Sequence, residues 1–410
     1  MLDEKRGRTL QVSIERFVAW LDRYGELSYD FQTFYAGPLG QHAKALYYRH
    51  RRLGTLAVAP IIFCEAFMPS ARQLFWKRQR FPIADAHFAM GFAALAQTLG
   101  QHKYYERAVH FLEVLEATRC AGQKHHAWGY PFDWVGIGGT IKAETPLITT
   151  EPYVYEAYAQ VYELDKQKKW REIMQSLALH ASEDYSDAIT SAGAASASYC
   201  PSVKPDAGMV VNASAYRAFL LTKAALDFSE DRYRRQAEKN LYFVLESQNA
   251  DGSWYYAMDG KRNFVDHFHT CFVMKALVKI ERLTGNRDCT AALERGVGYY
   301  VRHLFDERGL PKPFSKAPRL TVYKRELYDY AECINLATLL SGRFPELDGR
   351  LKTVLDDILT RWQRGDGSFR SRQLLLGWDN VPMHRWAGAQ LFRSLCLLLQ
   401  KRAGEPVPEK

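Results

Sequence analysis

The segment Asp266-His267-Phe268-His269 carries two imidazole side chains and a carboxylate within four residues. Histidine changes its charge near neutral pH, so it serves as a general acid or base or binds hydroxyl groups. Histidine is not a favoured residue at a helix start, whereas Asp266 could simply be an N-cap. We therefore expect His267 and His269 to do acid/base chemistry with Asp266 beside them. No supporting pattern of metal ligands is present, so we expect no metal ion.

Similar polar residues stand at the starts of other predicted helices, which converge on one opening if the helices form a closed ring. Tyr328 and His384 are predicted to transfer protons on the opposite face of the ligand. Arg325 and Arg385 are predicted to bind a carboxylate or phosphate, and Trp386 to stack on the ligand. The remaining predicted binding residues at helix starts are Asp85, His87, Glu151, Tyr153 and Asn212. Aspartate and asparagine at such positions could also be ordinary N-caps.

A loop rich in aromatic rings is predicted over residues 125–134, with the sequence HHAWGYPFDW. Above the opening, Trp128 and Trp134 could stack on sugar rings while Asp133 accepts hydrogen bonds from hydroxyl groups. The alternative is a small satellite core beneath a long loop. The glycines that follow lack the strand and helix of a dinucleotide-binding motif, so we expect no cofactor.

Six predominantly apolar helices must position these residues, and they begin near residues 85, 151, 212, 266, 328 and 384. Charged helices with one apolar stripe alternate with them, as expected for an outer layer, and strand patterns are almost absent. This alternation predicts an all-α fold, an (α/α)6 toroid in which a helix near residues 12–24 supplies the sixth outer helix. An open helical array is the alternative. We expect residues 1–80 to pack on or close the toroid, residues 81–400 to form it, and residues 401–410 to be a disordered tail.

Two predicted outer helices end in the same turn, QNADGSW at residues 248–254 and QRGDGSF at residues 363–369. Glycine permits a left-handed turn after a helix, and the aromatic ring can fold back onto the array. The pattern resembles the QW motif of the prenyltransferase and squalene-cyclase repeat superfamily, whose members are α/α toroids. The motif implies the fold rather than the reaction. Because the sequence has no Asp-rich cluster, terpene cyclase or prenyltransferase activity is only a minor alternative.

Four segments together resemble bacterial toroid proteins encoded among exopolysaccharide and O-antigen biosynthesis genes. They are WGYPFDW at 128–134, the turn ending in WYY at 254–256, VDHFHT at 265–270 and MHRW at 383–386. The resemblance spans about residues 80–400 and implies a six-hairpin toroid that acts on glycans. Similar toroids serve as sugar epimerases, unsaturated glucuronyl hydrolases and polysaccharide lyases, so the resemblance implies carbohydrate chemistry.

Three reactions fit the predicted residues. Epimerisation needs proton-transfer groups on opposite faces of a sugar ring, which His269 with His384 or Tyr328 could supply. Hydrolysis needs two carboxylates roughly 5–9.5 Å apart, for which Asp329 joins the acidic residues at the helix starts as a candidate. A lyase needs a Tyr or His base and a cation that neutralises a uronate. We favour epimerase-type proton transfer on an acidic or amino sugar of a surface polysaccharide.

The 410-residue chain has a net charge of +9 and a pI near 9.0, which favours an anionic substrate. No nucleic-acid-binding motif accompanies this charge, so we expect no nucleic acid partner. Part of the charge forms a basic patch, with residues Arg49, Arg51, Arg52, Arg72, Lys77, Arg78 and Arg80. This patch supports a competing hypothesis, a non-catalytic module that binds a glycan or a lipid-linked intermediate and scaffolds a glycosyltransferase.

Seven scattered cysteines without a CxxC pair argue against a disulfide framework and fit a reducing compartment. The N-terminus has no apolar core of a signal peptide. The longest apolar run, residues 53–67, is interrupted by Glu65 and is shorter than the roughly 20 residues of a membrane span. We therefore expect a cytoplasmic protein with at most peripheral membrane association.

Overall fold

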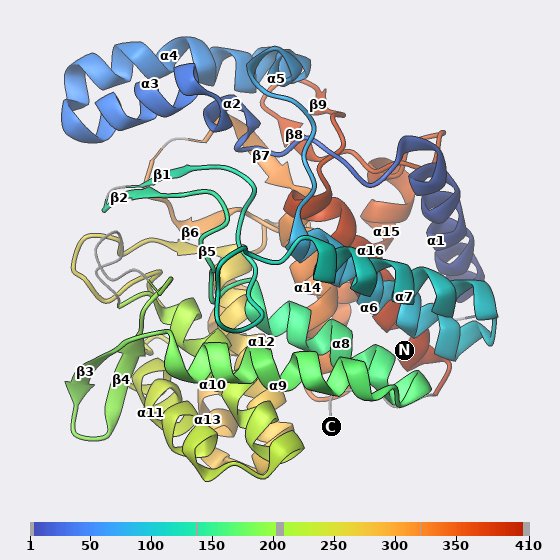
Figure 1. Cartoon of the computed structure of the whole chain (residues 1–410). Helices are drawn as coiled ribbons and strands as arrows, with labels where there is room; N and C mark the ends of the chain where they lie inside the picture. The colour runs from blue at the N-terminus through green and yellow to red at the C-terminus, as the bar shows by residue number, and fades with distance from the viewer. Residues whose placement is uncertain (1–3, 137, 202–208, 320, 405–410) are drawn as a thin grey trace.

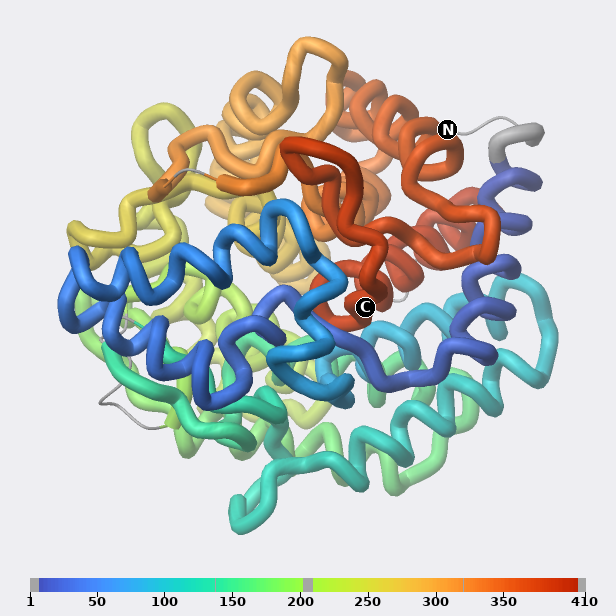
Figure 2. Tube along the Cα trace, turned by 90° about the horizontal axis from the view of Figure 1, so that it is seen from above, coloured from blue at the N-terminus to red at the C-terminus, as the bar shows by residue number. Residues whose placement is uncertain are grey.

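The computed structural model describes residues 4–136, 138–201, 209–319 and 321–404. Six inner helices form a closed ring, and six outer helices surround it (Figures 1 and 2). The inner helices are α6 (Pro82–Leu99), α8 (Glu151–Asp165), α10 (Val211–Phe228), α12 (His267–Thr284), α14 (Leu327–Leu339) and α16 (Ala389–Arg402). The outer helices are α1 (Glu4–Tyr24), α7 (His102–Ala117), α9 (Lys168–Glu183), α11 (Asp231–Glu246), α13 (Arg287–His303) and α15 (Pro345–Asp357). The predicted (α/α)6 toroid is confirmed.

The inner helices are buried because their sequences lack a continuous polar stripe. Every residue of α14 is buried, and so are the first fourteen residues of α6. The outer helices bury one face only, as α11 does with Tyr233, Ala237, Leu241 and Val244. Each inner helix packs against the next, and α16 packs against α6, which closes the ring.

The sixth outer helix is α1, from the opposite end of the chain. Gln248, after α11, donates from Nε2 to the carbonyl of Ala292 on α13 at 2.9 Å. Gln363, after α15, donates in the same way to the carbonyl of Ser13 on α1, also at 2.9 Å. In each turn the glycine before the serine has a positive φ, +93° at Gly252 and +95° at Gly367. A Cβ atom there would come within 2.4 Å of a backbone oxygen of the next outer helix, so α1 occupies the same position as α13.

Residues 25–80 form a further helical layer above the opening at which the inner helices begin, here called the mouth (Figures 1 and 2). This layer contains α2 (Thr33–Ala36), α3 (Pro38–Arg49), α4 (Arg51–Phe67) and α5 (Arg72–Phe75). Ion pairs attach it to the rest of the protein, among them Asp30 with Arg385 at 2.5 Å and Glu65 with Arg372 at 2.6 Å. The first 80 residues therefore contribute both an outer helix and a cover. The division of the chain into domains stays a prediction.

Short strands, which the sequence pattern did not indicate, precede several inner helices. The antiparallel pairs are β1 (Trp134–Gly136) with β2 (Gly139–Ile141), β3 (Asp187–Ser191) with β4 (Ala194–Ala197), and β5 (Val265–Asp266) with β6 (Phe314–Lys316). A three-stranded sheet contains β7 (Tyr323–Glu326), β8 (Arg372–Leu374) and β9 (Trp378–Asp379). Strands of two to five residues are too short for a periodic signal. β5 and β7 lead directly into α12 and α14 and hold the residues that begin these helices.

The end of the chain differs in part from the predicted tail. α16 continues to Arg402, so the first two residues of the predicted disordered segment 401–410 are helical. Residues 405–410 lie outside the described residues.

Candidate active site at the mouth of the toroid

Asp266 and His269 form a hydrogen-bonded pair at the start of α12. Oδ1 of Asp266 accepts the backbone N–H of His269 at 2.9 Å, and Oδ2 lies 2.6 Å from Nδ1 of the imidazole. A carboxylate at Nδ1 favours the tautomer with the proton on Nδ1, which leaves Nε2 as the basic nitrogen. The His269 side chain is 21% exposed, whereas Asp266 is buried. Asp266 is therefore both an N-cap and the partner of a histidine that a ligand can reach.

Aromatic rings surround this pair. Tyr328 and Trp386 stack with their ring centres 4.5 Å apart and their planes 7° apart. Phe268 meets both rings edge-on, at 5.2 and 5.3 Å. Phe272 lies between His269 and Tyr328, with ring centres 5.5 and 5.9 Å away. Trp386 is the partly exposed member of this cluster, and Phe31 of the cover lies 4.3 Å from its ring.

The backbone that carries Trp386 is strained. The π-helical turn His384–Gly388 precedes α16, and within it Ala387 has a φ of 142°, which residues other than glycine rarely adopt. Trp386 Nε1 donates to Glu326 at 2.7 Å, and Arg372 donates to the same carboxylate at 3.2 Å. Strained backbone held by buried polar contacts is common at functional sites.

Asp329 is a buried acid beside the Asp266–His269 pair. Within the described part of the chain, neither of its carboxyl oxygens has a hydrogen-bond partner. Burial, followed by the carboxylates of Glu326 and Asp266, raises the pKa of Asp329 well above its ordinary value. This shift favours the protonated form of Asp329, which would add no negative charge beside Asp266.

Polar side chains continue from the mouth along the axis of the ring. Tyr153 on α8 and Tyr216 on α10 share a hydrogen bond of 2.7 Å, and His87 on α6 lies 4.4 Å from the ring of Tyr153. Phe272 joins them to the cluster above, with its ring centre 5.4 Å from that of Tyr216. Burial, followed by Arg393, lowers the pKa of His87 well below its ordinary value, so this imidazole is neutral. The predicted residues His87 and Tyr153 thus face the axis.

Deeper in the ring lies a network of buried ion pairs. Lys275 on α12 pairs with Glu332 on α14, and Lys279 one turn later pairs with Glu156 on α8. Arg393 on α16 lies 3.3 Å from the same glutamate. Buried charges are tolerated when they are paired in this way. The sequence analysis missed this network, although two lysines four residues apart in an apolar helix were a usable signal.

His267 does not face the mouth, which corrects its predicted catalytic role. Its side chain is fully buried, with Nε2 2.6 Å from the hydroxyl of Tyr300. Nδ1 lies 3.1 and 3.2 Å from the carbonyls of Leu304 and Lys312. Burial lowers the pKa of His267 to about 3. Both nitrogens are occupied, so this histidine joins α12 to the outer layer.

His384 is likewise a structural residue in this arrangement. Its ring lies edge-on to Tyr24 at 5.6 Å and to Phe88 at 5.3 Å, and Nε2 is 3.0 Å from the carbonyl of Gly25. Burial lowers the pKa of His384 to about 4. The geometry therefore does not support the predicted pairing of His269 with His384 across a ligand.

The two arginines predicted to bind an anion are already paired. Arg385 donates to both carboxylate oxygens of Asp30, at 3.0 and 2.5 Å. Arg325 pairs with Asp306 and donates to Gln373 at 2.9 Å. Their charges are neutralised within the protein, so the geometry gives no support to their predicted role.

The aromatic loop packs mainly as a satellite core. Trp128 is fully buried, and its backbone N–H donates to Glu151 at 3.0 Å. Burial raises the pKa of Glu151 well above its ordinary value. Asp133 binds a lysine and a backbone N–H of its own loop at 2.8 and 2.9 Å. Trp134 is half-buried, with its ring centre 5.9 Å from that of Tyr130.

Asp85 and Asn212 are not N-caps, because Phe81 and Val210 occupy the cap positions of their helices. Asp85 lies 3.1 Å from Arg80, and burial raises its pKa to about 7. Asn212 is buried, and its side-chain oxygen has no partner among the described residues.

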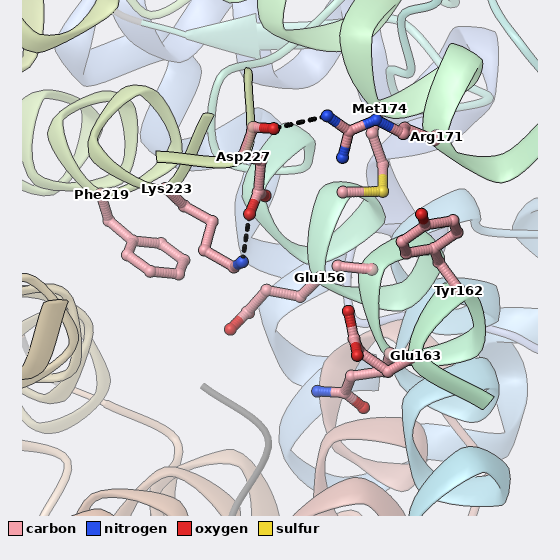
Figure 3. Close-up of a pocket in the computed structure, with 10 residues that line it drawn as sticks. Glu156, Tyr162, Glu163, Arg171, Met174, Phe219, Lys223 and Asp227 are labelled. Carbon is pink, nitrogen blue, oxygen red and sulfur yellow. Dashed lines mark hydrogen bonds and ion pairs between the residues drawn. The ribbon is translucent and has the colours of Figure 1, made fainter. Parts of the chain in front are cut away.

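A pocket lies toward the C-terminal ends of α8 and α10 (Figure 3). Lys223 and Asp227 pair within it at 2.7 Å, and Arg171 donates to the carbonyl of Asp227 at 2.7 Å. Glu156, which belongs to the ion network, also lines it. The pocket contains none of the residues that the sequence analysis selected.

No protein-family model matches the chain, and no curated protein matches it by sequence. Solved structures nevertheless share its fold. A cellobiose 2-epimerase from Bacillus thermoamylovorans B4167 aligns with a TM-score of 0.61 at 9% identity, covering 79% of this chain and 88% of that chain. A family 76 glycoside hydrolase from a bovine Bacteroides thetaiotaomicron strain aligns at 0.59 and 11% identity, covering 80% and 70%. An unsaturated glucuronyl hydrolase specific for heparin aligns at 0.58 and 10% identity, covering 80% and 88%. At these identities the likeness shows a common α/α toroid.

Proposed function

We propose that the protein is a carbohydrate-active enzyme that transfers a proton at a ring carbon of a sugar. The observation that carries this proposal is the partly exposed Asp266–His269 pair beside the stacked rings of Tyr328 and Trp386. Toroids of the same fold include a cellobiose 2-epimerase and two hydrolases of carbohydrates, which supports a sugar substrate.

The chemistry follows from the state of each group. Nε2 of His269 takes a proton from a carbon next to a carbonyl or carboxylate, and Asp266 stabilises the imidazolium that forms. Burial, followed by the carboxylate of Glu332, raises the pKa of Tyr328 well above its ordinary value, so its phenol keeps its proton. Tyr328 can then donate to the ligand from a second direction, while the partly exposed part of Trp386 gives the sugar an apolar contact.

The other reactions receive less support from this geometry. Hydrolysis requires two carboxylates that reach the ligand, but Asp266 is engaged by His269, and Asp329 is fully buried. A lyase could use the same histidine as its base. Its uronate would need a free cation, and Arg325 and Arg385 are paired with acids.

The biological setting belongs to the same proposal. The resemblance to exopolysaccharide and O-antigen proteins supports an acidic or amino sugar of a surface polysaccharide as substrate, modified in the cytoplasm. The net charge of +9 supports the anionic character of this substrate. A module that binds a glycan and scaffolds a glycosyltransferase is the competing function, and it predicts binding without turnover.

Incubation of nucleotide-sugar and polymer candidates in deuterated water, followed by NMR, tests the proposal. Deuterium at one ring carbon is the expected result and reports proton abstraction. A new unsaturated uronate would identify a lyase, and new reducing ends without unsaturation would identify a hydrolase. Glycan binding with none of these products would favour the scaffold function.

A further inference from the structure

Exposed apolar side chains are concentrated in one short part of the chain. Of the seventeen large apolar side chains exposed among the described residues, nine lie between residues 39 and 74. They are Leu39, Tyr48, Leu53, Leu56, Ile62, Phe63, Phe67, Met68 and Leu74. Scattered single residues of this kind need no explanation, but here five lie on α4 alone and the other four on α3, on α5 and at Met68. We call these nine residues the apolar face.

α4 supplies the centre of the apolar face. Leu56, Phe63 and Phe67 are 72%, 56% and 52% exposed and stand at helical spacing, with the rings of Phe63 and Phe67 5.1 Å apart. The opposite side of the same helix is buried against the protein through residues such as Val58 and Ile61. Between Leu53 and Phe67, the exposed polar side chain is that of Thr55, whose hydroxyl donates to its own helix at 2.7 Å. The exposed side of α4 therefore offers almost no group that could hydrogen-bond a partner.

Basic side chains border this face, and no exposed acid accompanies them. Arg49, Arg51 and Arg52 are exposed at the tip of the α3–α4 hairpin, and Lys77 is exposed after α5. From residue 31 to residue 84 the sequence contains one acidic residue, Glu65, which pairs with Arg372. The border of the apolar face is thus positively charged.

We propose that the apolar face docks the protein on an anionic lipid bilayer, with α4 lying in the plane of the membrane surface. An apolar helix face with arginines at its border matches acyl chains below and acidic headgroups above. A protein partner would be expected to meet hydrogen-bonding groups across the contact, which the exposed side of α4 lacks. This inference is independent of the proposed reaction.

The docking is peripheral because α4 is already bound to the protein along one side. Among the described residues, no single helix is long and apolar enough to cross a membrane. The pair Arg51–Phe67 and Pro69–Phe75 passes the length and composition test only together, with a bend of 119° between its parts. A helix with one buried side and one apolar exposed side lies in an interface rather than across it.

The β8–β9 hairpin is joined to the same layer, and its turn is also exposed and apolar. Its exposed tip carries Leu375 and Leu376. The ion pair of Arg72 with Asp379, at 2.9 Å, attaches this hairpin to α5. We include the exposed turn of this hairpin in the proposed docking surface, which then combines elements from both ends of the chain.

Co-sedimentation of the full chain with vesicles tests the proposal. We expect binding to vesicles of phosphatidylcholine with phosphatidylglycerol, and weaker binding to phosphatidylcholine alone. Leu56→Asp with Phe63→Asp should weaken binding at least about tenfold, because burying each of these side chains in an apolar phase is strongly favourable. A triple variant should also bind anionic vesicles about tenfold or more weakly, with no change on phosphatidylcholine alone. Its substitutions are Arg49→Gln, Arg51→Gln and Arg52→Gln.

Matched variants keep the test independent of folding. Ile189→Asp with Leu226→Asp changes two exposed apolar residues outside the face and should leave binding unchanged. Leu39→Asp with Leu74→Asp, on the flanking helices, should repeat the loss. Absence of wild-type binding, or equal binding by Leu56→Asp with Phe63→Asp, would overturn the proposal. So would a dimer that these two substitutions dissociate, since the face would then bind a second copy of the chain.

Discussion

The mouth and the axis of the toroid are both lined by inner helices, but their charges are arranged differently. On the axis, the lysines and acids are fully buried and paired, as Lys275 is with Glu332. At the mouth, His269 is partly exposed, Asp329 has no hydrogen-bond partner among the described residues, and Ala387 is strained. Paired buried charges are typical of structure, whereas a reachable base with an unpartnered acid beside it is typical of a site that does chemistry.

The largest expected effect is the loss of activity in His269→Asn. Asparagine cannot take a proton, so the rate should fall about 10²- to 10⁴-fold, while loss of the contact with the buried Asp266 should lower the free energy of unfolding by about 1–3 kcal/mol. Rates of deuterium incorporation and urea unfolding measure the two quantities. His102→Asn, on an exposed outer helix, is the control. A rate within about threefold of wild type would remove His269 from the mechanism.

The second effect concerns the axis. Lys275→Met leaves Glu332 buried without its partner, which should lower the free energy of unfolding by about 3–5 kcal/mol. The double change Lys275→Met with Glu332→Met removes both charges and should recover most of this loss. Lys168→Met breaks an exposed pair on α9 and should have no measurable effect in urea unfolding. A small loss in the single variant would mean that the axis is hydrated and does not differ from the mouth as described.

His384→Leu tests the corrected position of that histidine. The change leaves the carbonyl of Gly25 without its present partner, so we expect a loss of about 1–3 kcal/mol in the free energy of unfolding. Activity of the folded variant should stay within about threefold of wild type. A hundredfold loss of activity at unchanged stability would restore the predicted pairing of His384 with His269.

The fold could be predicted from sequence because fully apolar helices alternate with helices that carry one apolar stripe. Few folds bury both kinds of helix in this order. The direction of each side chain was harder to predict. His267 and His269 are two residues apart, which on a helix separates their directions by about 200°. One therefore faces the outer layer when the other faces the mouth. Periodicity also places Lys275 and Lys279 on the side of α12 that carries Phe268 and Phe272.

Other contacts at the site have no local sequence signal. The pairing of Arg385 with Asp30 joins residues 355 positions apart. Arg325 pairs with Asp306, which lies in a separate loop before β6. The sequence showed arginines at helix starts but not which acids the cover would bring to them. The strain at Ala387 is equally invisible, because alanine gives no warning of a positive φ.

The smallest expected change in activity belongs to Asp329→Asn, which also has the most specific dependence on pH. Because the folded protein raises the pKa of Asp329, the native state holds a proton that the unfolded chain releases above about pH 4. Wild-type stability therefore falls as pH rises from this value toward the raised pKa, and asparagine removes that fall. The free energy of unfolding of the variant, minus that of wild type, should therefore increase from pH 4 to pH 7. Urea unfolding at each pH measures this difference.

Activity of Asp329→Asn at neutral pH should stay within about threefold of wild type, since asparagine resembles the protonated acid in shape and charge. Asp231→Asn, on the surface of α11, should leave the pH dependence of stability unchanged. If Asp329→Asn instead lost stability most strongly at pH 7, the carboxyl would be ionised and paired in the native state. The mouth would then resemble the axis, and the contrast between the two regions would rest on His269 and the strained backbone alone.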